Sequence, residues 1–285
     1  MLLMKPFDYL AAATVDDAVR ALGSRSDARV LAGGTDLVVQ LKSGRREAGL
    51  IVDVKRIPEL TAIEFDDAGL RLGAAAACIH IASHRDVRAH YPALAEVAAL
   101  IGGTAIQGRA SIGGNLCNAA PSADAVPLLI ALSARARVAG PGGKREIAVE
   151  DFCVAPGKNA LATGEFLVEI FVPKPAPGTR AKYLRFIPRN EMDIAVAGVG
   201  VAVTVVDGKI TMARLALASV APTPLFVREV SGAMEGQAPS AALIEKAAVL
   251  AQAAARPISD MRAPADYRKH LCGVLSRRAL SAVLG

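Results

Sequence analysis

The 285-residue sequence is long enough for one large or two ordinary domains, and it can bury a substantial core without disulfides or structural metals. It is 53% hydrophobic and 21% charged, which excludes wholesale disorder, and its uncharged stretches are too short to span a bilayer as a helix. The net charge of +6 comes from scattered cations without interleaved aromatic residues, which favours a solvated surface over a nucleic-acid-binding one.

In the first 54 residues, hydrophobic periodicity predicts strands and helices in alternation. A helix begins after Thr14, which stands three residues before Asp17 as in a capping box, and it ends near Gly23. A strand over 28–31, a helix over 37–42 and a strand over 50–54 follow it. This order is typical of an α/β layer.

The segment from 63 to 172 mixes hairpins and helices. We expect hairpins over 63–74 and 135–149, helices over 79–87, 93–101 and 125–134, a long loop over 102–124, and a strand over 166–172. A long loop inside a compact domain is often functional.

A proline-rich segment, 173–178, marks a domain boundary because it is stiff and cannot continue a strand. Beyond it we expect strands over 194–206 and 210–219, which turn at Asp207-Gly208, and then three helices. The helices are predicted over 224–234, 240–255 and 264–284. The second domain is therefore predicted to be an antiparallel sheet packed against helices.

Two short Gly-Gly segments with hydroxyl and amide neighbours are the candidate binding elements. The first is Ala32-Gly33-Gly34-Thr35-Asp36, and the second is Ser111-Ile112-Gly113-Gly114-Asn115, which continues through Leu116-Cys117-Asn118. Each alone could be an ordinary tight turn. Together they suit a ligand with two phosphates and a polar sugar chain, because adjacent glycines let several N–H groups approach an anion. Asp124 could accept hydrogen bonds from sugar hydroxyls.

Other candidate motifs have simpler explanations. Gly198-Val199-Gly200 resembles a dinucleotide fingerprint but lies in an alternating strand pattern with no helix after it. The segment 141–144 lacks the spacing of a Walker loop and fits a hairpin turn. The four cysteines, Cys78, Cys117, Cys153 and Cys272, are far apart, and no His or Cys stands at metal-ligand spacing. We therefore expect no metal site, no catalytic nucleophile, no export signal and a cytoplasmic location.

At this point the motifs resemble a known family. Leu31-Ala-Gly-Gly-Thr-Asp36 and Ser111-Ile-Gly-Gly-Asn-Leu-Cys-Asn-Ala-Ala-Pro-Ser-Ala-Asp124 resemble the flavin loops of the FAD-binding medium subunit of molybdenum hydroxylases, the xanthine dehydrogenase and aerobic carbon monoxide dehydrogenase family. Segments 164–173, 183–195 and 266–278 also resemble that subunit, so the resemblance covers nearly the whole chain. Gln107-Gly108, Ser111 and Arg185 depart from the common pattern, where Arg-Asn, Thr and Lys are usual.

The resemblance implies an α+β fold. It implies a PCMH-type FAD-binding domain over 1–175, made of two α/β subdomains split near 56, followed by a C-terminal domain over 179–285. The residues implied to hold FAD are Ala32, Gly33, Gly34, Thr35, Asp36, Ser111, Ile112, Gly113, Gly114, Asn115, Asp124, Leu167 and Arg185. In that family Asp124 would hold a sugar hydroxyl, and Leu167 and Arg185 would approach the flavin.

The implied function is electron exchange through FAD. A small partner subunit would carry [2Fe-2S] clusters, a large one the molybdenum cofactor, and the complex would be a dimer of heterotrimers that reduces a small-molecule acceptor. Two alternatives stay open from the sequence. One is a self-sufficient flavin oxidase of the vanillyl-alcohol-oxidase type, and the other is a non-catalytic nucleotide-binding module.

Overall fold

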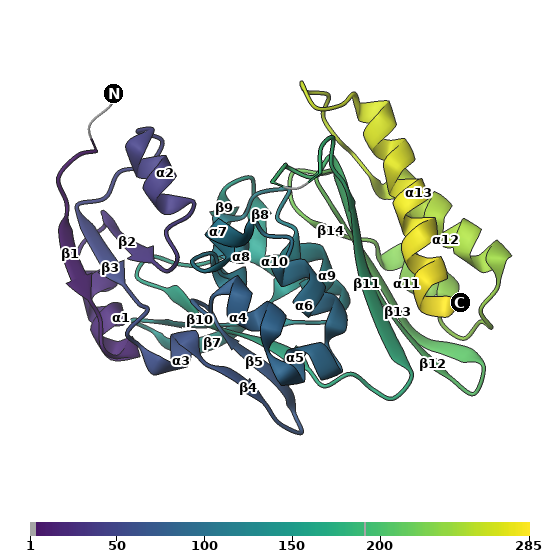
Figure 1. Ribbon diagram of the computed structural model, residues 1–285, viewed down its shortest axis with the longest axis horizontal. Helices are drawn as coiled ribbons and strands as arrows, with labels where there is room; N and C mark the ends of the chain where they lie inside the picture. The colour runs from purple at the N-terminus through teal and green to yellow at the C-terminus, as the bar shows by residue number, and fades with distance from the viewer. Residues whose placement is uncertain (1–3, 191) are drawn as a thin grey trace.

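The computed structural model describes residues 4–190 and 192–285 and contains three main sheets arranged in sequence (Figure 1). A three-stranded sheet in the order β1-β3-β2 comes first, then a five-stranded sheet in the order β4-β5-β10-β6-β7. A four-stranded sheet in the order β11-β12-β13-β14 comes last. Each sheet, with the helices that neighbour it in sequence, is called the first, second or third unit below. A hydrophobic cluster is centred on each unit, and residues such as Phe166 and Tyr183 extend the packing from one unit to the next.

The first sheet is entirely parallel. It consists of β1 (Asp8–Ala11), β2 (Ala28–Leu31) and β3 (Leu50–Asp53), with helices α1 (Val15–Ser24) and α2 (Leu37–Lys42) in the connections. The predicted cap at Thr14 is confirmed, because its hydroxyl accepts from the N–H of Asp17 at 3.1 Å. Strand β1 was not predicted, since three of its four residues are exposed and give no buried apolar run.

The second sheet is antiparallel and is covered by short helices. Its strands are β4 (Ile63–Phe65), β5 (Gly69–Gly73), β6 (Arg135–Gly140), β7 (Gly143–Ala148) and β10 (Phe166–Pro173). The helices of this region are α3 (Pro58–Thr61), α4 (Cys78–Ser83), α5 (Arg85–His90), α6 (Pro92–Ala98), α7 (Thr104–Gln107), α8 (Ile112–Asn118), α9 (Ala125–Ala131) and α10 (Val149–Phe152). A small hairpin of β8 (Cys153–Ala155) and β9 (Lys158–Asn159) precedes β10.

Two predictions for this region are wrong. The single helix expected over 79–87 is interrupted at His84, whose extended backbone separates α4 from α5. The long loop expected over 102–124 contains α7 and α8, which are four and seven residues long. Helices this short show no hydrophobic period, and α8 is in addition rich in Gly and Asn. The second Gly-Gly segment therefore lies in the first turn of a helix, not in a loop.

The third sheet is antiparallel and lies between two helical layers (Figure 1). Its strands are β11 (Thr179–Phe186), β12 (Ala197–Val206), β13 (Lys209–Ala218) and β14 (Leu225–Phe226). Helix α9 of the second unit contacts one face of the sheet. In the C-terminal unit α11 (Arg228–Met234) and α13 (Ala265–Leu284) pack on the sheet, and α12 (Ala241–Ala254) packs on these two helices. The helix predicted from 224 begins only at Arg228, because Leu225 and Phe226 pair with β13.

Gly200 explains how closely the third sheet meets the second unit. A β-carbon there would lie 2.5 Å from the carbonyl carbon of Pro127 in α9. The prediction that Gly198-Val199-Gly200 is strand packing is confirmed, since these residues lie in β12. Nearby, Arg214 of β13 and Arg228 both pair with Glu150 of α10, the latter at 2.6 Å.

Among the described residues, no helix is long and apolar enough to cross a membrane.

Candidate functional site

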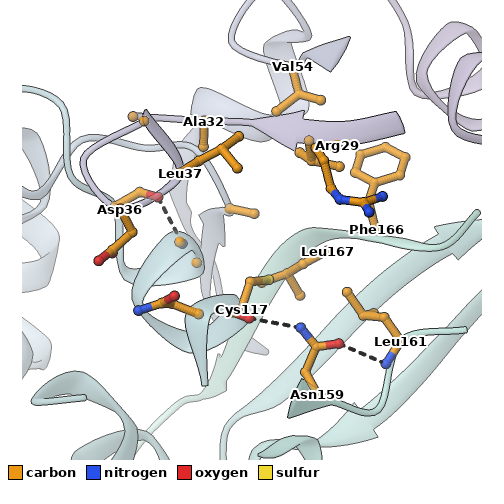
Figure 2. A pocket seen from close by; sticks show the side chains of 18 of the residues that line it. Arg29, Ala32, Asp36, Leu37, Val54, Cys117, Asn159, Leu161, Phe166 and Leu167 are labelled. Carbon is orange, nitrogen blue, oxygen red and sulfur yellow. Dashed lines mark hydrogen bonds between the residues drawn. The ribbon is translucent and has the colours of Figure 1, made fainter. Parts of the chain in front are cut away.

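A cavity of about 440 Å³ lies between the first and second units. Its walls come from both Gly-Gly segments, from the end of β2 and from the chain around 161–167. Figure 2 shows Ala32 and Asp36 on one side of this cavity, with Cys117 and Leu167 across from them. The cavity therefore joins segments that are far apart in sequence.

The first Gly-Gly segment leaves β2 and enters α2 as an open turn. Gly34 has φ of +79°, a conformation that favours glycine. The backbone N–H groups of Gly33, Gly34, Thr35 and Asp36 donate to no acceptor within the part of the chain that the structure describes. All four residues line the cavity, so this turn offers unpaired donors to a ligand.

The second Gly-Gly segment forms the start of α8. Ser111 is its N-cap, and its hydroxyl accepts from the N–H of Gly114 at 3.0 Å. Within the described chain the N–H groups of Ile112 and Gly113 have no acceptor. Gly113 is required sterically, because a β-carbon there would lie 2.3 Å from the carbonyl oxygen of Ala74. A β-carbon on Gly114 would meet only the Ser111 hydroxyl, at 3.1 Å, so this position opens toward the cavity.

The two segments meet directly. The backbone of Gly33 packs against Arg109, two residues before the second segment, so that a β-carbon on Gly33 would lie 1.8 Å from the carbonyl oxygen of Arg109. Farther along, Gln40 of α2 donates through Nε2 to Oδ1 of Asn118 in α8, at 2.9 Å. These contacts place unpaired N–H groups from both segments around one cavity.

The charge around the cavity is mixed but includes several cations. Arg25, Arg29 and Arg46 line it, and Figure 2 shows the guanidinium of Arg29 beside the ring of Phe166. Asp36 is the acidic residue of the first segment, and burial raises its pKa. Burial also raises the pKa of the Cys117 thiol to about 12, so Cys117 is a neutral lining group rather than a nucleophile.

The predicted site residues fall into two places. The five residues of the first segment, together with Ser111, Gly113, Gly114, Asn115 and Leu167, line the cavity. Ile112 lies behind it in the core and is 1% exposed. Asn115 also accepts at Oδ1 from the N–H of Ala125, at 3.3 Å, and so joins α8 to α9.

Asp124 and Arg185 are brought together with each other, but they do not line this cavity. Oδ2 of Asp124 lies 2.6 Å from Nη1 of Arg185, and its Oδ1 accepts from the hydroxyl of Tyr183 at 2.7 Å. Burial raises the pKa of Asp124 more than the pairing with Arg185 lowers it. The three side chains join α9 of the second unit to β11 of the third.

Several lining residues were not singled out from the sequence. Arg29 precedes the first segment in β2, so its position next to a motif was the available signal. Asn118 belongs to the second motif but was assigned no role from the sequence. Asn159 carries no such signal. Its side-chain nitrogen donates to the carbonyl of Cys117 at 2.8 Å, and its oxygen accepts from the N–H of Leu161 at 3.2 Å (Figure 2).

Comparison with known proteins decides the family. Residues 5–175 match the family described as FAD binding domain in molybdopterin dehydrogenase, and residues 182–283 match the CO dehydrogenase flavoprotein C-terminal domain. The chain belongs to this family of molybdenum hydroxylase flavoproteins. The predicted α+β fold, with an FAD-binding domain followed by a C-terminal domain, is thereby confirmed, as is its class as an oxidoreductase subunit.

Named relatives are similar in sequence to this chain over almost its full length. The carbon monoxide dehydrogenase medium chain of Hydrogenophaga pseudoflava is 34% identical over 97% of this chain and 96% of its own. The xanthine dehydrogenase FAD-binding subunit of Escherichia coli O157:H7 is 30% identical over 96% and 94%.

Solved structures of related enzymes superpose on almost the whole chain. The structure of carbon monoxide dehydrogenase from Hydrogenophaga pseudoflava superposes with a TM-score of 0.94 at 33% identity, over 99% of this chain and 98% of the other. Quinoline 2-oxidoreductase from Pseudomonas putida 86 gives 0.91 at 25% identity, over 99% and 100%.

The flavoprotein's own residues fit FAD, the cofactor expected of this family. Unpaired backbone donors from two segments surround one cavity, and Gly114 keeps one wall free of side-chain atoms. Such donors suit a diphosphate. Among the described residues, no three His, Cys, Asp or Glu side chains gather in a way that could hold a metal ion.

Proposed function

We propose that this flavoprotein is the FAD-carrying electron-transfer subunit of a molybdenum-containing hydroxylase or dehydrogenase. It would receive electrons from the [2Fe-2S] clusters of a small partner subunit and pass them to an external acceptor. The observation that carries the proposal is the meeting of the two Gly-Gly segments at Gly33 and Arg109. Bound FAD supplies a centre that can exchange electrons singly or in pairs.

Within that function we propose separate roles for the residues. The N–H groups of 33–36 and of Gly113 would bind the diphosphate, because these residues line the cavity and their N–H groups lack acceptors in the described chain. The N–H of Ile112, whose side chain lies in the core, would add to them from the first turn of α8. Leu167 would contact the flavin from the cavity wall. Asp124, the N-cap of α9 in the second unit, would hold a sugar hydroxyl, and Arg185 of β11 in the third unit would approach the flavin. The two side chains already pair with each other.

We also propose a division of the chain into two domains. We place an FAD-binding domain at 1–175, with two subdomains split near 56, and a C-terminal domain at 179–285. The three hydrophobic clusters, one centred on each unit, support this division. The complex would be a cytoplasmic dimer of heterotrimers, in which a large subunit carries the molybdenum cofactor.

The test is to purify the tagged protein from its native host and identify the retained proteins by mass spectrometry. FAD, iron and molybdenum are then quantified before and after the complex is separated. The proposal predicts that about one FAD per chain stays with this subunit, while iron and molybdenum leave with the partners.

Two other outcomes would replace the proposal. Turnover of an organic alcohol by the isolated yellow chain would favour a vanillyl-alcohol-oxidase-type enzyme. A colourless chain that binds only mononucleotides would favour a binding module.

A further inference from the structure

The first Gly-Gly segment is held from outside the cavity by a lysine. The ammonium of Lys55 donates to the carbonyl oxygen of Ala32 at 2.9 Å, although the two residues are 23 positions apart. Lys55 follows β3, the central strand of the first sheet, and Ala32 follows the neighbouring strand β2. The lysine therefore connects the central strand to the turn that begins the site.

Lys55 is itself fixed by two further side chains. Its ammonium lies 2.6 Å from Oδ1 of Asp53, and its backbone N–H donates to the same oxygen at 3.0 Å. Oδ2 of Asp53 accepts from the hydroxyl of Tyr9 in β1, at 2.7 Å. The side chains of Lys55 and Asp53 are 25% and 11% exposed, so this pair is screened from solvent more than a surface pair.

The carbonyl held by Lys55 belongs to the same peptide group as the N–H of Gly33. In a trans peptide the N–H points away from the C=O, and the described chain has no cis peptide. A cation on the Ala32 oxygen therefore directs the Gly33 N–H to the opposite side, and Gly33 lines the cavity. The carbonyl group of the next peptide also has a partner, because Nε of Arg109 donates to the carbonyl oxygen of Gly33 at 3.4 Å.

We infer that Lys55 is a positioning residue for the diphosphate of the flavin. It acts through the Ala32–Gly33 peptide, which it orients and polarises so that the Gly33 N–H becomes a stronger donor. Chains of hydrogen bonds strengthen one another in this way, and the effect is larger where a member is charged. The inference rests on the proposed function and names a residue outside the cavity that the family motifs do not include.

The main variant is Lys55→Met, which keeps the length of the side chain and removes the charge and the donors. Because this leaves Asp53 without its partner, the double variant Asp53→Asn/Lys55→Met removes both charges and keeps the contact with Tyr9. The matched control is Lys182→Met, since Lys182 also pairs with a carboxylate, Glu96 at 2.8 Å, on another part of the surface.

Three readouts are taken on the full chain. They are the dissociation constant for FAD by titration of the apoprotein, the ³¹P resonances of the bound diphosphate, and the melting temperature of the apoprotein. We expect the dissociation constant to rise about tenfold or more in both Lys55 variants, as the loss of one charge-assisted contact predicts. The ³¹P resonances should shift, while Lys182→Met changes neither.

Unchanged affinity and unchanged ³¹P resonances in the folded double variant would overturn the inference. A weaker affinity with unshifted ³¹P resonances would also overturn it, because Lys55 would then act only on general stability. These failures are distinct from failure of the proposed function. In that case the wild-type chain itself would not bind FAD, or Gly114→Val would bind it normally.

Discussion

The α-carbon of Gly33 lies so close to the carbonyl oxygen of Arg109 that a β-carbon on Gly33 would stand 1.8 Å from that oxygen. This contact joins the turn after β2 to Arg109, which stands two residues before the cap of α8. Together with the hydrogen bond from Gln40 to Asn118, it joins the first and second units beside the cavity, and we expect the proposed diphosphate site to depend on it.

Replacing Gly33 with alanine should therefore force the two segments apart. We expect Gly33→Ala to lower the free energy of unfolding by roughly 1–3 kcal/mol, as overpacking does, and to reduce FAD content strongly. Gly108→Ala is the control, because a β-carbon there meets nothing within 4 Å. Denaturant unfolding and flavin absorbance measure the two effects. Wild-type flavin content in Gly33→Ala would show that the site tolerates separation of the segments.

Gly114 tests the cavity without disturbing the packing. A branched side chain at this position would occupy the space next to the donors, yet its β-carbon would meet only the Ser111 hydroxyl. We expect Gly114→Val to fold with a nearly wild-type melting temperature and to be largely free of flavin. The control is Gly142→Val, in the turn between β6 and β7, where a β-carbon meets nothing within 4 Å. This variant should retain its yellow colour. Full flavin stoichiometry in Gly114→Val would count against the assignment of this wall.

The Asp124–Arg185 pair should matter for stability. Both side chains are nearly buried, at 13% and 8% exposure, so removing the carboxylate leaves a guanidinium without its partner. We expect Asp124→Ala to lower the free energy of unfolding by about 3–5 kcal/mol. The double variant Asp124→Asn/Arg185→Leu should recover part of that loss. If Asp124→Ala unfolds at the same denaturant concentration as wild type, the pair does not join α9 to β11 in the way described.

The ion pairs of Glu150 should make the free energy of unfolding depend on pH. Burial raises its pKa, but hydrogen bonds from Arg214 and Arg228 outweigh burial and hold the pKa below the ordinary value of 4.5. A carboxylate with a lowered pKa in the folded state stabilises the fold above pH 4.5, and this contribution is lost as the pH falls through the folded pKa. Glu150→Gln should cost about 2 kcal/mol at pH 7 and make the acid limb of the stability curve less steep.

The control for Glu150 is an exposed pair. Glu245 pairs with Arg277 on the surface at 2.6 Å, and Glu245→Gln should change stability little because such pairs are screened. Urea unfolding from pH 3 to pH 7 measures both variants. Equal pH profiles for Glu150→Gln and wild type would contradict the role given to this ion pair.

The sequence predicted the elements that have a clear period or cap. Helix α1, with Thr14 at its start, and the hairpin of β6 and β7 follow directly from local pattern. Strand β1 and helices α7 and α8 could not be predicted, because β1 is largely exposed and the two helices are too short for a hydrophobic period. Local signals therefore located the Gly-Gly segments but misassigned the second one to a loop.

The site was predictable only where local patterns mark its residues. Motif residues such as Gly33 and Gly114 stand out by composition, but their convergence is a tertiary contact that no local pattern contains. The connections made by Lys55 and Asn159 depend on strand order and on hairpin packing. The buried pairing of Asp124 with Arg185 likewise required the position of the third sheet against α9.

The most direct test of the central claim is an experimental structure of the flavin-loaded protein. The account predicts that the diphosphate lies within hydrogen-bonding distance of N–H groups from both 33–36 and 112–113. A diphosphate that contacts only one of these segments, or a flavin bound outside this cavity, would contradict it.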